Sequence, residues 1–230
     1  MYDARLGETL PQVRERIARA LARAGRGDEV SLVAVTKGHP LAAVQAAVAG
    51  GLRMLGENRV QELDEKVAAV GRRFAEWHLI GHLQRNKARR ALGLFDRIHS
   101  IDSLRLAETL SSEAARVDRD VRGYVQVNVS GEETKGGFEG PEAVDAIGAM
   151  VAMPRLHLEG LMTMAPLTHD ARRLHETFSA ARRLLEEARR QFPALDAGLS
   201  MGMSNDFEVA VEEGATILRL GTVLFGERRT

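Results

Sequence analysis

The feature that most constrains this fold is a regular alternation of short runs rich in valine, isoleucine and leucine with longer segments of helical periodicity. The short runs predict eight strands, at residues 31–36, 52–56, 76–80, 95–99, 122–129, 156–162, 197–201 and 216–220. Helical patterns fill the gaps, for example at 41–50, 59–70, 103–118, 141–150 and 170–191. Because parallel strands need a covering crossover between them, the alternation predicts an α/β fold with a parallel sheet.

Eight parallel strands are also the number that closes a TIM-type (β/α)₈ barrel, which typically takes about 250 residues. The chain has 230 residues and begins with an extra amphipathic helix at 5–24, where apolar residues recur at three- and four-residue steps. An open doubly wound sheet is the competing architecture, but no Gly-x-Gly-x-x-Gly motif follows the first predicted strand. We therefore expect a single barrel domain over residues 1–230 with an additional N-terminal helix.

The composition argues against several classes of protein. Thirty-two lysines and arginines balance 32 aspartates and glutamates, so no global field attracts nucleic acid or an anionic membrane. The absence of cysteine excludes disulfides and thiol nucleophiles and is compatible with a reducing cytosol. The first residues do not resemble a secretory signal, no apolar stretch approaches the roughly 20 residues of a membrane span, and the histidines lack metal-binding spacing. We expect a cytoplasmic protein without a metal site.

Lys37 is placed at the carboxyl end of the first predicted strand, directly before Gly38-His39-Pro40. Desolvating an ammonium group beside an apolar core is costly, and that cost lowers the pKa of the lysine and frees its amine to form an imine. The alternative is a lysine whose flexible side chain simply reaches solvent from the strand end.

Two loops at the same end of the predicted barrel carry groups suited to a phosphate. After the seventh strand, Ser204 or Asn205 can cap the next helix, whose free N–H groups bind anions. After the eighth strand, Gly221 exposes backbone N–H groups and Thr222 offers a hydroxyl. Because the eighth strand of a closed barrel lies beside the first, this phosphate site neighbours Lys37. An imine-forming lysine beside a phosphate site is typical of pyridoxal phosphate binding.

Arg219, near the end of the eighth strand, can point towards the ring of such a cofactor. An arginine keeps its proton and can only donate to the pyridine nitrogen, which leaves the ring a poor electron sink. A surface arginine in a salt bridge is the alternative. Asn58, after the second strand, can bond the cofactor hydroxyl or can be only the N-cap of the next helix.

Several segments of the sequence resemble those of a known family, the YggS/PROSC family. They follow the family order almost end to end: Val33–Lys37, Leu55–Glu62, Trp77–Lys87, Leu161–Met164, Leu199–Asp206 and Arg219–Thr222. The tryptophan-histidine segment is specific to the family. The resemblance implies a pyridoxal phosphate homeostasis protein, with a barrel similar to the N-terminal domain of bacterial alanine racemase and the cofactor held as a Schiff base on Lys37.

The same resemblance implies that Arg219 faces the pyridine nitrogen and that four residues surround the phosphate: Ser200, Ser204, Gly221 and Thr222. Members of the family have no established turnover and are thought to buffer or deliver pyridoxal 5′-phosphate. Lys135 matches a family lysine suggested as a second, transient cofactor site, although Gly136 stands where the family often has serine.

Catalytic turnover is less well supported by these residues than binding. A racemase needs an acid/base group on each face of its cofactor, and the racemase fold takes its tyrosine from a second domain. The two tyrosines here are Tyr2, before the first helix, and Tyr124, near the start of the fifth strand. We expect a non-catalytic, monomeric carrier that contacts apo-enzymes transiently. A weak amino acid enzyme remains the alternative, with His82 either moving a proton or only orienting its loop, as does a protein that regulates others by binding.

Overall fold

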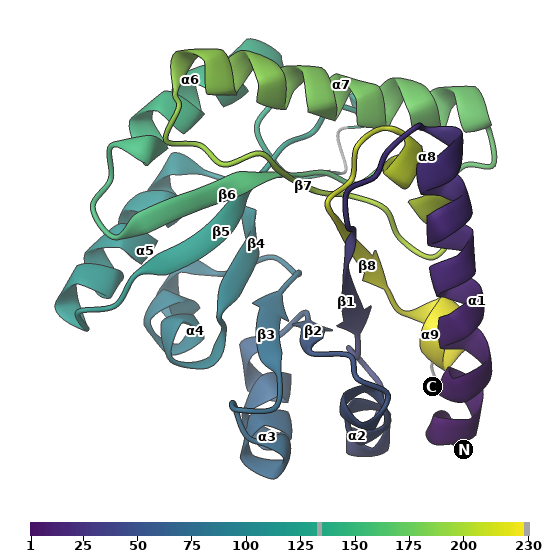
Figure 1. The fold of residues 1–230 in the computed structure, drawn as a ribbon. Coiled ribbons are helices and arrows are strands. Elements are labelled where there is room, and N and C mark those ends of the chain that lie inside the picture. The colour runs from purple at the N-terminus through teal and green to yellow at the C-terminus, as the bar shows by residue number, and fades with distance from the viewer. Residues whose placement is uncertain (133–134, 228–230) are drawn as a thin grey trace.

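The computed structural model describes residues 1–132 and 135–227 and contains a closed barrel of eight parallel strands in sequence order (Figure 1). The strands are β1 (Ser31–Val35), β2 (Met54–Glu57), β3 (Glu76–Leu79), β4 (Arg97–Ile101), β5 (Val121–Gln126), β6 (Leu156–Met162), β7 (Gly198–Ser200) and β8 (Ile217–Leu220). Pairing of β8 with β1 closes the barrel. The predicted (β/α)₈ architecture is confirmed.

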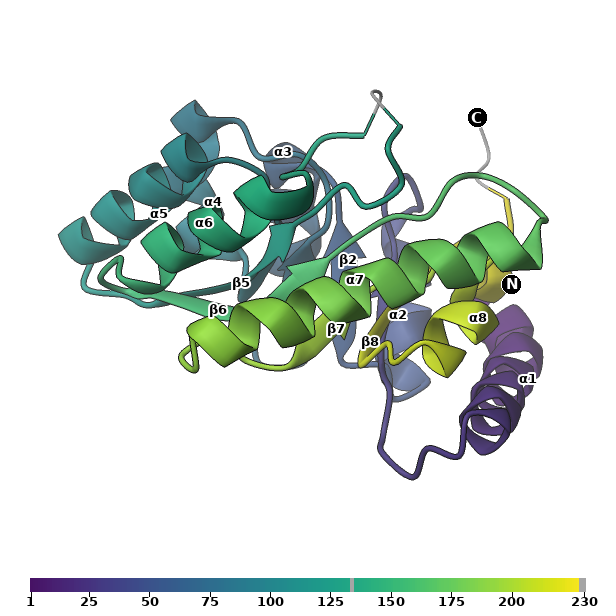
Figure 2. The same ribbon diagram turned by 90° about the horizontal axis from the view of Figure 1, so that it is seen from above.

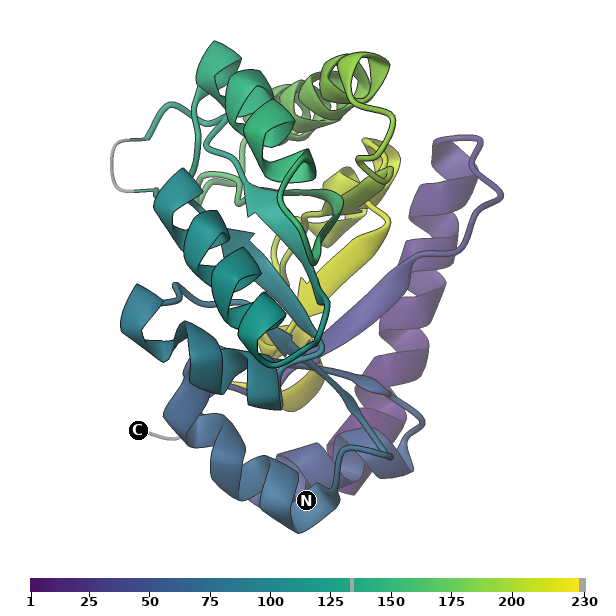
Figure 3. The ribbon, with the colours of Figure 1, turned by 90° about the vertical axis from the view of Figure 1, so that its left-hand side faces the viewer.

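Helices connect the strands and lie outside them. They are α1 (Tyr2–Arg23), α2 (Leu41–Ala49), α3 (Val60–Val70), the 3₁₀ turn η1 (Arg85–Lys87), α4 (Ala88–Leu94), α5 (Leu104–Arg116), α6 (Gly140–Val151), α7 (Ala171–Gln191), α8 (Phe207–Glu212) and α9 (Thr222–Phe225). Figure 3 shows the strands running between α1, in purple, and the teal helices on the opposite side. Among the described residues, no helix combines the length and the apolar character that a membrane crossing needs.

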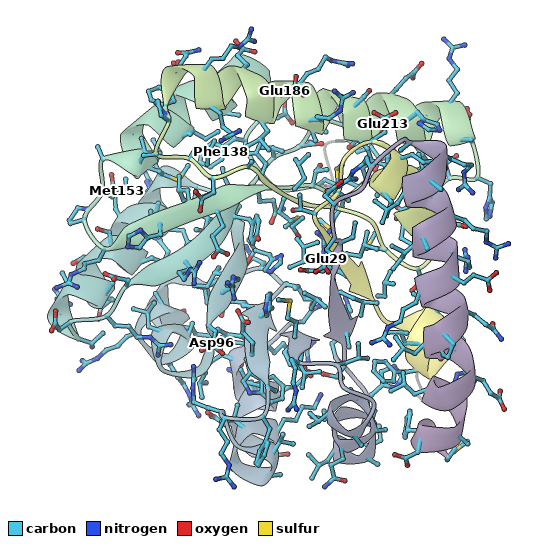
Figure 4. All side chains as sticks on the ribbon, in the orientation of Figure 1. Glu29, Asp96, Phe138, Met153, Glu186 and Glu213 are labelled. Atoms are coloured by element: carbon cyan, nitrogen blue, oxygen red, sulfur yellow. The ribbon has the colours of Figure 1, made fainter. Side chains whose placement is uncertain are left out.

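The predicted strands agree with the observed ones to within two residues, except at the end of the fifth, which was predicted to reach residue 129 and ends at Gln126. There the backbone turns to a later segment that contains Phe138, labelled in Figure 4. Phe138 N donates to Gln126 O at 2.9 Å, and Asn128 N donates to Phe138 O at 2.9 Å. Val127 N keeps one bond to β6, to Met162 O at 2.9 Å, and the paired register with β6 ends at Gln126.

The extra helix predicted at the N-terminus is α1, which packs beside α8 (Figures 1 and 2). Its apolar stripe is buried, and Arg16 Nη2 donates to Glu208 Oε2 of α8 at 2.7 Å. At its start, the ring of Tyr2 lies edge-on to two rings, with centroids 5.9 Å from His39 and 6.4 Å from Phe225 of α9. Tyr2 is the first residue of α1, whereas we expected it to precede the helix. It meets the loop after β1.

The large apolar core lies between the strands and the helices, as the alternation predicts. A second, much smaller cluster joins Val33, Tyr124, Met162 and Ile217, which come from four different strands. Buried polar residues accompany it on the strands, among them His78, His99, Ser200 and Arg219. The barrel interior is therefore unusually polar for a core, which points to a role beyond packing.

A substitution at Gly160 tests how closely β6 approaches β7. Its φ is +140°, and a Cβ built there would lie 1.8 Å from Gly198 O. We expect Gly160→Ala to lower the free energy of unfolding by about 3 kcal/mol or more, because both the backbone and the neighbouring strand must move. Gly93→Ala in α4 is the matched control, since nothing lies within 4 Å of that Cβ. Urea denaturation measures both, and equal stabilities would contradict the expectation.

Candidate functional site

Lys37 lies in a tight turn at the carboxyl end of β1 and is half-buried. Thr36 N donates to Gly56 O of β2 at 3.0 Å, and His39 N donates back to Thr36 O at 3.0 Å. Gly38 adopts a φ of +68°, which explains the glycine that directly follows the lysine. The chain thus leaves the barrel at Lys37, and the predicted place of this lysine at a strand end is confirmed.

A buried ion pair anchors that turn from below. Lys66 Nζ, on α3, donates to Glu57 Oε1 at 2.6 Å and to Thr36 O at 2.8 Å, and Thr36 Oγ1 donates to Glu57 Oε1 at 2.5 Å. The Glu57 side chain is 0% exposed, and burial raises its pKa while Lys66 opposes that shift. We did not anticipate this pair from the sequence. Its one signal was a lysine on the apolar face of the helix predicted at 59–70.

Arg219 is buried at 5% exposure and is held by neutral acceptors. Nη1 donates to Ser200 O at 2.7 Å and to Ser200 Oγ at 2.6 Å, and Nη2 donates to Thr163 O at 2.9 Å. Burial lowers the pKa of Arg219 to about 10, and the charge of Asp206 partly offsets this. The guanidinium therefore stays protonated at neutral pH. The alternative of a surface salt bridge is excluded, since Arg219 forms no ion pair with a described carboxylate.

The register of β8 against β1 sets where the phosphate candidates lie. Val33 pairs with Arg219, and Ala34 pairs with Leu220. A Cβ built on Gly221 would lie 3.4 Å from both Cβ and O of Val35. Gly221 therefore lies against the end of β1, two residues before Lys37.

The loops after β7 and β8 also meet. Ser204 Oγ accepts from Val223 N of α9 at 3.2 Å, beside the exposed Thr222. Ser204, Thr222 and Gly221 are thus gathered in one place. Ser200 is not among them, because its buried hydroxyl is bonded to Arg219, and its direct contact with a phosphate stays a prediction.

The N-cap of α8 is Asp206, not Ser204 or Asn205 as we expected. Asp206 Oδ1 accepts from Met203 N at 2.5 Å and closes a turn over residues 203–206, so helical geometry begins only at Phe207. Burial raises the pKa of Asp206, whereas hydrogen bonding to Met203 lowers it.

Two further predicted residues lie at the same end of the barrel. The N-cap of α3 is Arg59, which excludes that role for Asn58. A Cβ on Gly81 would lie 2.6 Å from Asn58 O, so Asn58 packs against the loop after β3. In that loop His82, whose side chain is 68% exposed, places Nδ1 2.8 Å from Asp102 Oδ2. The structure thus shows an oriented histidine at the rim.

Lys135 reaches the end of β6 from the loop before α6. Its Nζ donates to Met164 O at 3.2 Å and pairs with Glu132 Oε2 at 2.8 Å. Glu133 and Thr134, which precede it in the matched motif, lie outside the described residues.

Tyr124 is the fourth residue of β5 and lies inside the barrel, not near the start of the strand as we expected. Its ring centroid is 4.7 Å from that of His99. Burial raises the pKa of Tyr124 to about 12, so its hydroxyl stays neutral.

The described residues contain no group of three or more His, Asp or Glu side chains that could hold a metal ion.

Comparison with known proteins places this geometry in a family. The model of the alanine racemase N-terminal domain matches residues 9–229. The pyridoxal phosphate homeostasis protein of Aquifex aeolicus is 41% identical over 225 residues, which are 96% of this chain and 98% of that protein. The corresponding protein of Escherichia coli K12 is 37% identical over 231 residues, 97% of each chain.

A solved structure agrees. PipY of Synechococcus elongatus PCC7942, with pyridoxal phosphate bound, has a TM-score of 0.82 and 41% identity and covers 91% of this chain and 100% of its own. These matches define a barrel of the alanine racemase N-terminal type. The chain belongs to the family of pyridoxal phosphate homeostasis proteins, and the resemblance found in its sequence is confirmed.

The Glu57–Lys66 pair predicts a specific stability pattern. We expect Lys66→Met to lower the free energy of unfolding by about 3 kcal/mol or more, because it leaves a carboxylate buried without its counterion. Glu57→Gln combined with Lys66→Met should recover much of the loss, since the amide oxygen still accepts from Thr36. Chemical denaturation of the three proteins measures this. A double variant no more stable than Lys66→Met alone would refute the role of the pair.

Proposed function

We propose that this chain binds pyridoxal 5′-phosphate as a Schiff base on Lys37 and acts in intracellular homeostasis of that cofactor as a carrier or buffer. The names of its relatives and the bound ligand of PipY support the proposal. The single observation that carries it is the meeting of the β1 and β8 ends, where Gly221 lies against Val35 and Arg219 pairs with Val33.

The groups present fit this cofactor. Pyridoxal 5′-phosphate supplies an aldehyde, which condenses with a primary amine and releases water, together with a phosphate and a pyridine nitrogen. Lys37 offers the amine. Ser204 and Thr222 offer hydroxyls, and the start of α9 offers backbone N–H groups. No described hydrogen bond uses Arg219 Nε, which can donate to the ring nitrogen. Asn58 is proposed to bond the ring hydroxyl.

The side chains proposed to surround the cofactor ring favour binding without turnover. Arg219 stays protonated and can only donate, so the nitrogen it meets keeps no proton of its own and draws little charge from the reacting carbon. Tyr124, a possible acid/base group, is buried and neutral beside His99. We further propose a cytoplasmic monomer that meets apo-enzymes transiently, with Lys135 as a second, short-lived attachment point.

A weak amino acid enzyme is the second candidate, and one observation favours it. Asp102 bonds His82 at Nδ1, which leaves Nε2 at the rim available to accept or give a proton.

Reductive trapping tests the attachment site. The chain has only four lysines: Lys37, Lys66, Lys87 and Lys135. We expect pyridoxal phosphate to colour the protein, and borohydride followed by peptide mass spectrometry to place the pyridoxyl group on Lys37. Lys37→Ala should remove the colour, and Lys87→Ala, the matched control, should keep it. A colourless wild-type protein, or unchanged colour in Lys37→Ala, would contradict the proposal.

Transfer assays separate the carrier from the enzyme. Loaded protein should activate a pyridoxal phosphate-dependent apo-enzyme, whereas free amino acids should show no racemisation or transamination when incubated with it. His82→Asn is the informative variant, because it keeps a polar side chain and removes the imidazole ring. Turnover of an amino acid that disappears in His82→Asn would establish the second candidate instead.

A further inference from the structure

A line of buried polar side chains runs behind Arg219 through the barrel interior. Ser200 Oγ lies 2.6 Å from Arg219 Nη1 and 2.7 Å from His99 Nδ1. His99 Nε2 lies 2.8 Å from His78 Nδ1. His78 Nε2 lies 3.6 Å from Glu76 Oε1. The line joins β8, β7, β4 and β3, and both histidines and the serine are 0% exposed.

Arg219, at one end of this line, fixes the direction of its hydrogen bonds. Arg219 can only donate, so Ser200 Oγ accepts from it and gives its own proton to His99 Nδ1. His99 then carries its proton on Nε2 and donates to His78 Nδ1. His78 in turn carries its proton on Nε2, which lies 3.6 Å from the Glu76 carboxylate and forms no hydrogen bond with a described residue. The reverse direction would turn a bare His78 Nε2 towards that carboxylate and leave the Ser200 proton between two donors.

The charges around the line agree with this direction. Burial lowers the pKa of His99 well below its ordinary value and that of His78 to about 4, so both rings are neutral at physiological pH. Arg97 ion-pairs with Glu76 and, at 2.6 Å, with Glu159 beneath the line. A neutral His99 can accept from Ser200, whereas an imidazolium cannot.

Arg219 depends on this support because its described partners are neutral. A buried guanidinium without a carboxylate partner is held by its hydrogen bonds alone, here two to Ser200 and one to Thr163. If the Ser200 hydroxyl loses its own acceptor on His99, it is free to rotate, and its lone pairs are no longer held towards Arg219 Nη1, which weakens one of the three bonds that orient the guanidinium.

We propose that His99 and His78 are positioning residues for Arg219, which through Ser200 aim the remaining N–H donors of the guanidinium at the ring of the bound cofactor. The proposal rests on the proposed function, because it concerns the cofactor ring. It assigns both histidines the Nε2–H tautomer, and it gives this buried polar line a purpose that packing alone does not require.

Nitrogen-15 NMR of the histidines tests the direction in the cofactor-free protein. We expect His78 and His99 to be neutral Nε2–H tautomers at about pH 7. An Nδ1–H tautomer or an imidazolium at either ring would overturn the proposal. This readout depends neither on cofactor loading nor on a variant that folds.

Variants test the effect on the cofactor. His99→Phe keeps the ring and removes the acceptor, whereas His99→Asn places Oδ1 where Nδ1 was and can still accept from Ser200. His157→Phe is the control, since His157 lies on β6 with 62% of its side chain exposed. We expect His99→Phe to weaken pyridoxal phosphate binding about tenfold or more and to shift its absorption band. His99→Asn should stay within about threefold of wild type, and His157→Phe should match it.

The outcomes separate this inference from the proposed function. A wild type that carries no pyridoxal phosphate on Lys37 would refute the proposed function. A loaded wild type accompanied by a folded His99→Phe variant with unchanged affinity and band would refute this inference alone. So would a His99→Asn variant as weak as His99→Phe. Thermal unfolding midpoints establish that each variant compared is folded.

Discussion

Pairing of β8 with β1 is the constraint on which the site depends. Its register sets Arg219 opposite Val33 and carries Gly221 to the end of β1, beside the turn that holds Lys37. These residues come from opposite ends of the sequence, so only closure of the barrel brings them together. Helix α1 reinforces the same junction, because Tyr2 packs against both the loop after β1 and α9. The fold is therefore closed where the proposed chemistry takes place.

The polar interior of the barrel has an energetic cost that packing does not explain. Burying a charge is unfavourable unless hydrogen bonds replace water. Arg219 meets this requirement with neutral oxygens, and Glu57 meets it with Lys66. Arg219 is itself proposed to touch the cofactor, and Glu57 supports the turn that holds Lys37, so stability and function share the same bonds. A carrier must hold its ligand in one geometry without activating it, and a guanidinium held by fixed acceptors suits that requirement.

Much of the fold could be predicted from the hydrophobic periodicity and the lengths of the sequence segments. The strand at 156–162 was predicted at its observed bounds, and the long helix α7 to within one residue. No bounds were predicted for α4, α8 and α9, since helices of seven, six and four residues give too few turns for a periodic pattern. The fifth strand was extended too far because Val127 and Val129 continue its apolar run, whereas the backbone on either side of Val127 bonds to Phe138.

The sequence by itself determined which side chains stand at strand ends: Lys37, Asn58 and Arg219 each follow or close an apolar run, and a parallel barrel sends all such ends to one face. Only the tertiary structure decided which of them meet and what supports them. His78, His99 and Ser200 come from three different strands, and each fits an ordinary alternating pattern. Their hydrogen-bonded line depends on the stagger of strands around a closed barrel, a property of the whole sheet that no single segment records.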